Sequence, residues 1–201
     1  MHSSAYVSIP PIPEAHFLKS INLAVARNAS YVPPSSTDAL LYIRPIVFGS
    51  AGQLVLQPSN EYIFCVYVLP GNSYHGVHAL DALVMENFDR AAPMGTGSAK
   101  VGGNYAPVIR WSNKARSEGF GITLHLDSKQ QRTIEEFSTS GFLGIKEDAS
   151  GITVVVPNSS NVIESITSES CVEMAKHLGW KIERREVGDL QSLLYSTYIY
   201  G

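Results

Sequence analysis

The sequence is poor in cysteine and lacks long apolar runs. Its 201 residues include two cysteines, Cys65 and Cys171, each in an apolar stretch. We therefore expect buried free thiols in a reducing compartment rather than a disulfide framework. No apolar run approaches the roughly 20 residues of a membrane-spanning helix, and the N-terminus has no signal-peptide pattern. The sequence predicts a soluble, intracellular protein, with no distinction between cytoplasm and organelle.

The sequence also has no large excess of positive or negative charge. The 15 basic and 18 acidic residues are interspersed and give a net charge of -3. No cluster of lysines or arginines could follow a phosphate backbone, so we expect no nucleic-acid partner. We predict no metal site. Hydrophobic residues make up 44% of the chain, enough to bury a core in one domain or in two small ones.

Apolar periodicity and turn residues divide the chain into helices and strands. Helices are expected at about 14–29, at 104–118 with Asn104 as a candidate cap, and from Thr167, with Val172, Ala175 and Leu178 facing inward. Strands are expected at 40–48, 62–69, 83–88, 121–126, 132–136, 141–147, 151–156 and 181–187. Because strict βαβ order is absent, an α+β fold is favoured over a doubly wound sheet.

Lys100 lies in the glycine-rich stretch 94–103. A P-loop needs glycine directly before its lysine and Ser or Thr directly after it, but Ala99 and Val101 occupy those places. The dinucleotide fingerprint fails as well, because its third glycine is missing. An amine buried between two small apolar residues would favour its neutral form, which can form a Schiff base. Spacing alone leaves open both a solvated loop lysine and a catalytic one.

Two neighbouring stretches carry a specific resemblance. Residues 88–93 (FDRAAP) and 97–105 (GSAKVGGNY) are similar to the core signature of branched-chain amino acid aminotransferases, of the class IV pyridoxal-phosphate family. Residues 42–45 (YIRP), 71–76, 134–136 (IEE) and 165–167 (SIT) resemble further family motifs in the same order. The resemblance covers nearly the whole chain. It is strongest to fungal paralogues, some of which belong to secondary-metabolite or toxin pathways.

The resemblance implies a fold and a domain plan. The fold would be that of fold-type IV enzymes. Residues 1–70 would form part of a small domain, 71–77 the interdomain loop, and 78–201 a large cofactor-binding domain that is incomplete at its C-terminal end. Because the family is generally dimeric, a homodimer is implied.

The resemblance also assigns roles around pyridoxal 5′-phosphate. Lys100 would form the Schiff base and then move the substrate α-proton. Tyr105 would meet the phenolic oxygen of the cofactor, Glu136 its ring nitrogen, and Ile166 with Thr167 its phosphate.

Two glutamates stand side by side in the predicted strand at 132–136. Strand alternation sends Glu135 and Glu136 to opposite faces, so only one can face the cofactor. We expect Glu135 to be a surface carboxylate.

Tyr42, Arg44 and Tyr74 match substrate-contacting positions of the family. The implied reaction exchanges an amino group between a branched-chain or similar hydrophobic L-amino acid and 2-oxoglutarate. Tyr42 and Arg44, two residues apart on one strand, would point to the same face. A plain amphipathic strand with a surface arginine is the alternative.

The family pattern extends beyond both ends of the sequence, where it includes an arginine and a turn that bind the phosphate. Phe137 and Gly141 also replace a small residue and an asparagine usual in the family. An inactive truncated paralogue that acts as a binding or structural partner is therefore an alternative. A related lyase or D-amino-acid transaminase is a third, against which the 42–45 stretch argues.

Overall fold

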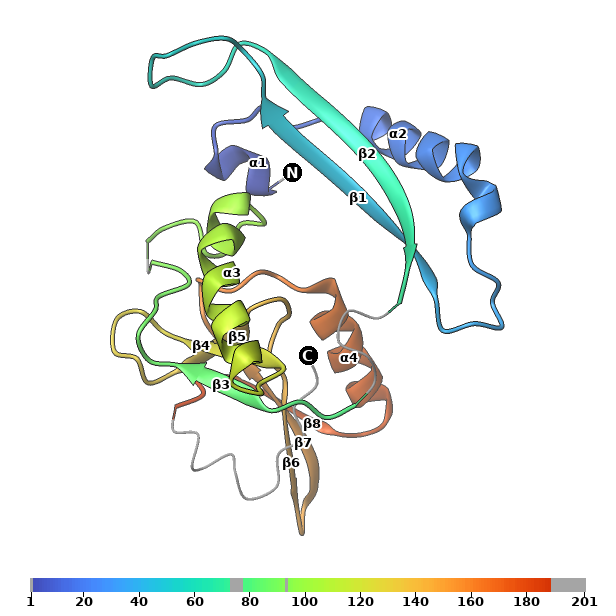
Figure 1. Cartoon of the computed structure of the whole chain (residues 1–201). Coiled ribbons are helices and arrows are strands. Elements are labelled where there is room, and N and C mark those ends of the chain that lie inside the picture. The colour runs from blue at the N-terminus through green and yellow to red at the C-terminus, as the bar shows by residue number, and fades with distance from the viewer. Residues whose placement is uncertain (1, 73–77, 93, 189–201) are drawn as a thin grey trace. The chain divides into compact units, whose positions relative to one another are not determined.

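The computed structural model describes residues 2–72, 78–92 and 94–188. By its internal contacts the chain separates into two compact units, Met1–Val77 and His78–Gly201 (Figure 1). No helix in these described ranges is long and apolar enough to cross a bilayer.

The first unit is a two-stranded ribbon with a helix packed on it. Its elements are α1 (His2–Tyr6), α2 (Glu14–Arg27), the 3-10 turn η1 (Ala29–Tyr31), β1 (Leu40–Gly49) and β2 (Tyr62–Gly71). β1 and β2 pair in antiparallel register from Leu40 opposite Gly71 to Gly49 opposite Tyr62. The aromatic rings of Phe17 on α2 and Phe64 on β2 stack with centroids 5.8 Å apart. The predicted helix and paired strands are confirmed.

The second unit contains two three-stranded sheets, each with one parallel and one antiparallel pair. The first consists of β3 (Ala82–Met85), β4 (Ile122–Leu126) and β5 (Ile134–Phe137), and α3 (Gly102–Ser117) connects the parallel strands β3 and β4. The second consists of β6 (Gly144–Asp148), β7 (Gly151–Pro157) and β8 (Lys181–Arg185), and α4 (Ile166–His177) connects the parallel strands β7 and β8.

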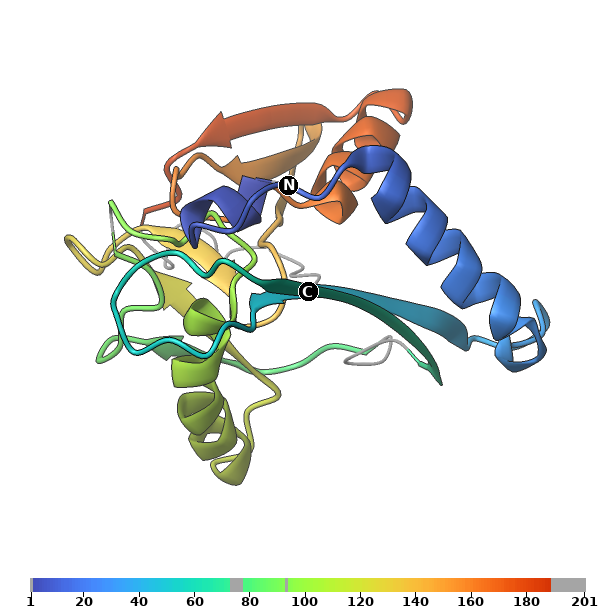
Figure 2. The ribbon, with the colours of Figure 1, turned by 90° about the horizontal axis from the view of Figure 1, so that it is seen from above.

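Two apolar clusters hold this unit together. One joins the sheets through β4, β5 and β7 and contains Ile122, Leu124, Leu126, Ile134, Phe137, Phe142, Val155 and Val187. The other lies between α4 and the second sheet, which are neighbours in Figure 2, and contains Leu143, Val154, Val156, Val172 and Ala175. Each fully buried aliphatic or aromatic side chain of this kind contributes about 1.5–3 kcal/mol. The site described below therefore stands on a rigid base.

Three residues that were expected to be buried are exposed. Cys65 and Cys171 are both exposed. Cys65 alternates along β2 with Phe64, which packs toward α2, so its own side chain points to the other face. Cys171 directly precedes the buried Val172 on α4 and faces solvent. Leu178 is 63% exposed because it lies one residue beyond the last turn of α4.

Candidate active site

Residues 96–100, which end at Lys100 and are called the lysine segment below, are bound to the start of α3 by Asn104. The amide nitrogen of Asn104 donates to the carbonyl oxygens of Thr96 (2.6 Å) and Ala99 (2.9 Å), and its amide oxygen accepts from the Thr96 hydroxyl at 2.9 Å. The prediction of a capping role was wrong, since the N-cap position is Val101 and no side chain caps it. Asn104 instead points back into the segment and holds the residues that precede Lys100.

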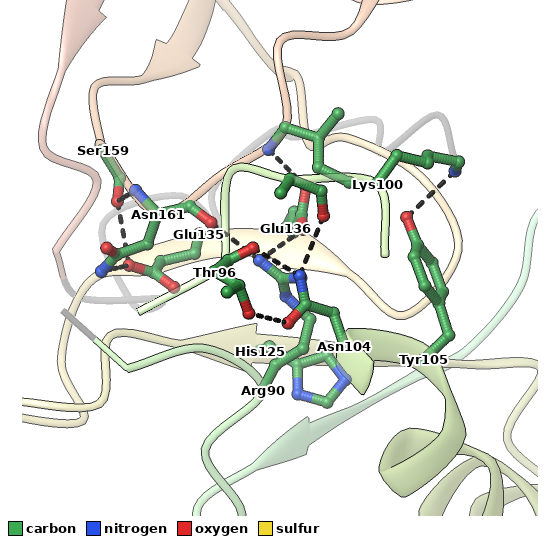
Figure 3. Close-up of polar contacts among 12 residues, drawn as sticks. Arg90, Thr96, Lys100, Asn104, Tyr105, His125, Glu135, Glu136, Ser159 and Asn161 are labelled. Atoms are coloured by element: carbon green, nitrogen blue, oxygen red, sulfur yellow. Dashed lines mark hydrogen bonds and ion pairs between the residues drawn. The ribbon is translucent and has the colours of Figure 1, made fainter. Parts of the chain in front are cut away.

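Lys100 directly precedes the cap of α3, and its amine meets Tyr105 in the first turn. The amine donates to the phenol oxygen of Tyr105 at 3.0 Å and lies 4.8 Å from the ring centroid (Figure 3). A short polar contact and a cation–π contact thus act on the same ammonium group.

A β-bulge positions the two glutamates. His125 on β4 pairs with Glu136, and Leu126 pairs with Ile134, so Glu135 is an extra residue on β5. Ile134 and Phe137, on either side of the glutamates, both belong to the same apolar cluster. The prediction of simple alternation was therefore wrong, because the bulge breaks the two-residue period at this point.

Glu136 is buried and ion-paired. It is 5% exposed, its Oε1 lies 2.5 Å from Nη2 of Arg90, and its Oε2 accepts a long hydrogen bond of 3.4 Å from the amide of Ile163. Burial raises the pKa of Glu136 to about 7, while the Arg90 guanidinium acts in the opposite direction. A carboxylate with a pKa near neutrality can exchange a proton with a basic ring nitrogen.

Glu135 is buried as well, at 3% exposure, so the prediction of a surface carboxylate was wrong. Its Oε1 accepts hydrogen bonds from the hydroxyl of Ser159 at 2.9 Å and from the side-chain amide nitrogen of Asn161 at 3.0 Å. The physical reason is the bulge, which turns the extra residue of edge strand β5 toward the segment that follows β7.

No role was predicted from the sequence for Arg90 or His125. Arg90 is 7% exposed and donates to the carbonyl oxygen of Asn161 at 2.9 Å in addition to its pair with Glu136. His125 is fully buried, with Nε2 3.1 Å from the hydroxyl of Thr123. Burial and the nearby Arg90 charge lower the pKa of His125 to about 4, so the imidazole is neutral at pH 7. Burial of Arg90 follows from Glu136, and residues 88–93 alone carry no signal of it.

Ile166 and Thr167 open α4 and are both exposed. The side chain of Ser165 caps the helix by accepting from the amide of Ser168 at 3.1 Å. The first amides of a helix have no intrahelical acceptor and favour an anion there. The turn therefore has the chemistry for a phosphate.

The proposed substrate residues belong to the other unit. Tyr42 and Arg44 share one face of β1, as their spacing predicted, and the guanidinium carbon lies 4.8 Å from the tyrosine ring centroid. Tyr74 lies outside the described residues. In the part of the chain that the structure describes, no group of three or more His, Cys, Asp or Glu side chains could hold a metal ion.

Comparison with known proteins decides the family. Residues 1–191 match the family described as amino-transferase class IV. The chain belongs to the class IV aminotransferases. The structural observations on the lysine, tyrosine and glutamate thus concern a member of a family that depends on pyridoxal phosphate.

This class IV aminotransferase is similar to several fungal proteins. It is 56% identical to aminotransferase poxL of Penicillium oxalicum over 92% of this chain and 51% of that protein. It is 57% identical to aminotransferase atnJ of Emericella nidulans over 90% of this chain and 53% of that protein. It is 45% identical to the branched-chain amino acid aminotransferase gloG of Glarea lozoyensis over 96% of this chain and 55% of that protein. The chain spans about half the length of these relatives.

Solved structures show the fold. The branched-chain aminotransferase of Thermoproteus uzoniensis with norvaline superimposes with a TM-score of 0.79 at 21% identity, over 100% of this chain and 64% of that one. The branched-chain amino acid aminotransferase of Thermobaculum terrenum in its PLP form has a TM-score of 0.77 at 19% identity, over 100% of this chain and 63% of that one. The predicted α+β, fold-type IV architecture is confirmed.

Proposed function

We propose that this chain takes part in a pyridoxal-phosphate-dependent transamination between a branched-chain or similar hydrophobic L-amino acid and 2-oxoglutarate. The observation that carries the proposal is the Lys100 amine held at 3.0 Å by the Tyr105 phenol. It lies in the same unit as the buried Glu136–Arg90 pair and the capped start of α4.

These residues fit the cofactor by their chemistry. An amine suits its aldehyde carbon, a buried carboxylate suits its ring nitrogen, and the amides at Ile166 and Thr167 suit its phosphate. The bound cofactor would supply an electron sink for the charge that develops at the substrate α-carbon. The neutral His125 beside Arg90 adds no positive charge to this region.

Lys100 has two tasks in this proposal. Its amine would hold the cofactor and would also carry the α-proton of the substrate. The hydrogen bond to Tyr105 places the amine near the start of α3. Glu136 would accept a hydrogen bond from the protonated ring nitrogen, and Arg90 limits the cost of burying that carboxylate.

Substrate selection would involve Tyr42, Arg44 and Tyr74. A guanidinium such as that of Arg44 can bind the side-chain carboxylate of glutamate or the distal carboxylate of 2-oxoglutarate. The name of gloG supports a branched-chain substrate. We propose that the active assembly is a homodimer, which light scattering of the purified protein would show.

Absorbance of the purified chain with added pyridoxal 5′-phosphate tests the proposal. We expect visible absorbance from lysine-bound cofactor, its loss in Lys100→Ala, and amino transfer from L-leucine but not from D-alanine. Lys129→Ala, which removes an exposed lysine of the same unit, is the matched control. Absence of cofactor absorbance in the unmodified chain would contradict the proposal and favour an inactive binding partner. Transfer from D-alanine instead would favour the D-amino-acid reaction.

A further inference from the structure

Glu135 is a buried acid to which the proposed reaction assigns no task. It is the extra residue of the β5 bulge, and its exposed fraction is 3%. A buried carboxylate costs several kcal/mol unless hydrogen bonds compensate it, so its retention needs a physical account. The account lies in the segment 159–163, which the carboxylate contacts (Figure 3).

We infer that Glu135 is a positioning residue whose carboxylate fixes segment 159–163 against the Arg90–Glu136 pair and the lysine segment. Glu135 does not touch the reacting atoms in this inference. It acts through Asn161 and Ser159, whose side chains it accepts from at 3.0 and 2.9 Å.

Asn161 is the junction of this arrangement. Its side chain donates to Glu135, while its own carbonyl oxygen accepts from Arg90 at 2.9 Å. The same Nη2 atom of Arg90 reaches Glu136 at 2.5 Å. Through one residue, therefore, the position of Glu135 determines where Arg90 can stand beside Glu136.

Two further contacts extend this coupling. The amide of Asn161 donates to the Ser159 hydroxyl at 3.1 Å, and that hydroxyl in turn donates to Glu135. Two residues on, the amide of Ile163 reaches the second oxygen of Glu136 at 3.4 Å. The adjacent acids thus hold the two ends of one short segment, Glu135 at Ser159 and Asn161, and Glu136 at Ile163.

The lysine segment abuts the same junction. A Cβ placed on Gly97 would lie 2.5 Å from the carbonyl oxygen of Asn161, so the two backbones are in direct contact there. Gly97 precedes Lys100 by three residues. Loosening of segment 159–163 would therefore free the Glu136 carboxylate and remove support from the lysine segment.

Amide hydrogen exchange in the cofactor-free chain tests the positioning directly. In Glu135→Ala we expect exchange at Asn161 and Ile163 to accelerate by about tenfold or more, since their acceptors lose their support. Glu135→Gln, which keeps an acceptor oxygen at that position, should stay within about threefold of the unmodified chain. Val155 on β7 serves as the internal reference. Glu164→Ala, on an exposed residue of the same connection, is the matched control.

Cofactor affinity then tests the coupling through Asn161. Glu135→Ala and Asn161→Ala should each weaken binding of pyridoxal 5′-phosphate by about tenfold, and the double variant by little more than either, since residues that act through one contact are not additive. This part rests on the proposed function.

The two measurements separate the possible failures. Unchanged exchange in Glu135→Ala, or fully additive losses of affinity, would overturn the inference. If Glu135→Ala does not fold, the exchange of Asn161→Ala at Ile163 decides the question in the same way. If the unmodified chain binds no cofactor, the proposed function fails while the exchange result still decides the role of Glu135.

Discussion

The amine of Lys100 donates a hydrogen bond of 3.0 Å to the phenol oxygen of Tyr105. The two residues stand on either side of the α3 start, so the helix cap determines the distance between their side chains. Tyr105 thereby becomes the residue through which the helix can orient the amine.

Tyr105→Phe removes this hydrogen bond and keeps the ring beneath the ammonium group. We expect the transamination rate to fall by about tenfold, the effect of one hydrogen bond to a charged group. Stopped-flow absorbance with L-leucine measures it. The thermal midpoint of the variant should match that of the unmodified chain, and an unchanged rate would show that the phenol is not needed.

Asn104→Ala would remove the side-chain donor from the carbonyl oxygens of Thr96 and Ala99, each of which keeps one backbone N–H donor. We expect the free energy of unfolding to fall by about 1–3 kcal/mol, because each side-chain hydrogen bond that is removed contributes roughly 0.5–1.5 kcal/mol. Urea unfolding measures the change. Asn113→Ala, on an exposed position of the same helix, should stay within about 0.5 kcal/mol; equal losses in both variants would refute the fastening role.

Glu136 gives the cofactor-free chain a characteristic dependence on pH. Its pKa is about 7 in the folded protein against 4.5 ordinarily, so the folded state binds more protons than the unfolded state between these values. Stability from this group is therefore greatest below pH 4.5 and is lost as pH rises toward about 7.

Unfolding of the unmodified chain and of Glu136→Gln across this pH range checks the prediction. The contribution of Glu136 should be missing from the curve of the variant. His125, whose pKa is lowered to about 4, gives the stability curve the opposite slope, because its contribution to protein stability is lost as pH falls below 6.5. This second slope remains in both proteins. Parallel curves would mean that Glu136 titrates normally.

Gly97→Ala places a methyl group 2.5 Å from both the Cβ of Ala91 and the carbonyl oxygen of Asn161. We expect a loss of about 1–3 kcal/mol in the free energy of unfolding through overpacking. Gly102→Ala is the matched control, because its added Cβ would meet nothing within 4 Å. A similar effect in both variants would show that the measured loss does not come from crowding.

Local sequence signals identified most elements of the fold. The helices expected at 14–29 and 104–118 and the strands expected at 40–48 and 62–69 are present as α2, α3, β1 and β2. Gly119 and Gly179, which follow α3 and α4, have φ of +95° and +75°. Such features depend on neighbours along the chain, which a sequence displays directly.

Less of the candidate site than of the fold could be predicted from the sequence. The cofactor roles of Lys100, Tyr105 and Glu136 came from the family resemblance and stay predictions, although the contact between Lys100 and Tyr105 is present. The burial of Glu135 depends on a bulge and on residues 24 and 26 positions later in the chain. No pattern within the strand predicts the bulge or these partners. Regular alternation led to the wrong prediction of a surface carboxylate.

The contact between Gly97 and Asn161 also limits how this segment can change over generations. The obstructing oxygen at position 161 belongs to the main chain, so no exchange of side chain there would remove it. A larger residue at position 97 should therefore have no simple intragenic suppressor at position 161, unlike a clash between two side chains. In a library that randomises both positions, glycine should be recovered at 97 whatever residue stands at 161.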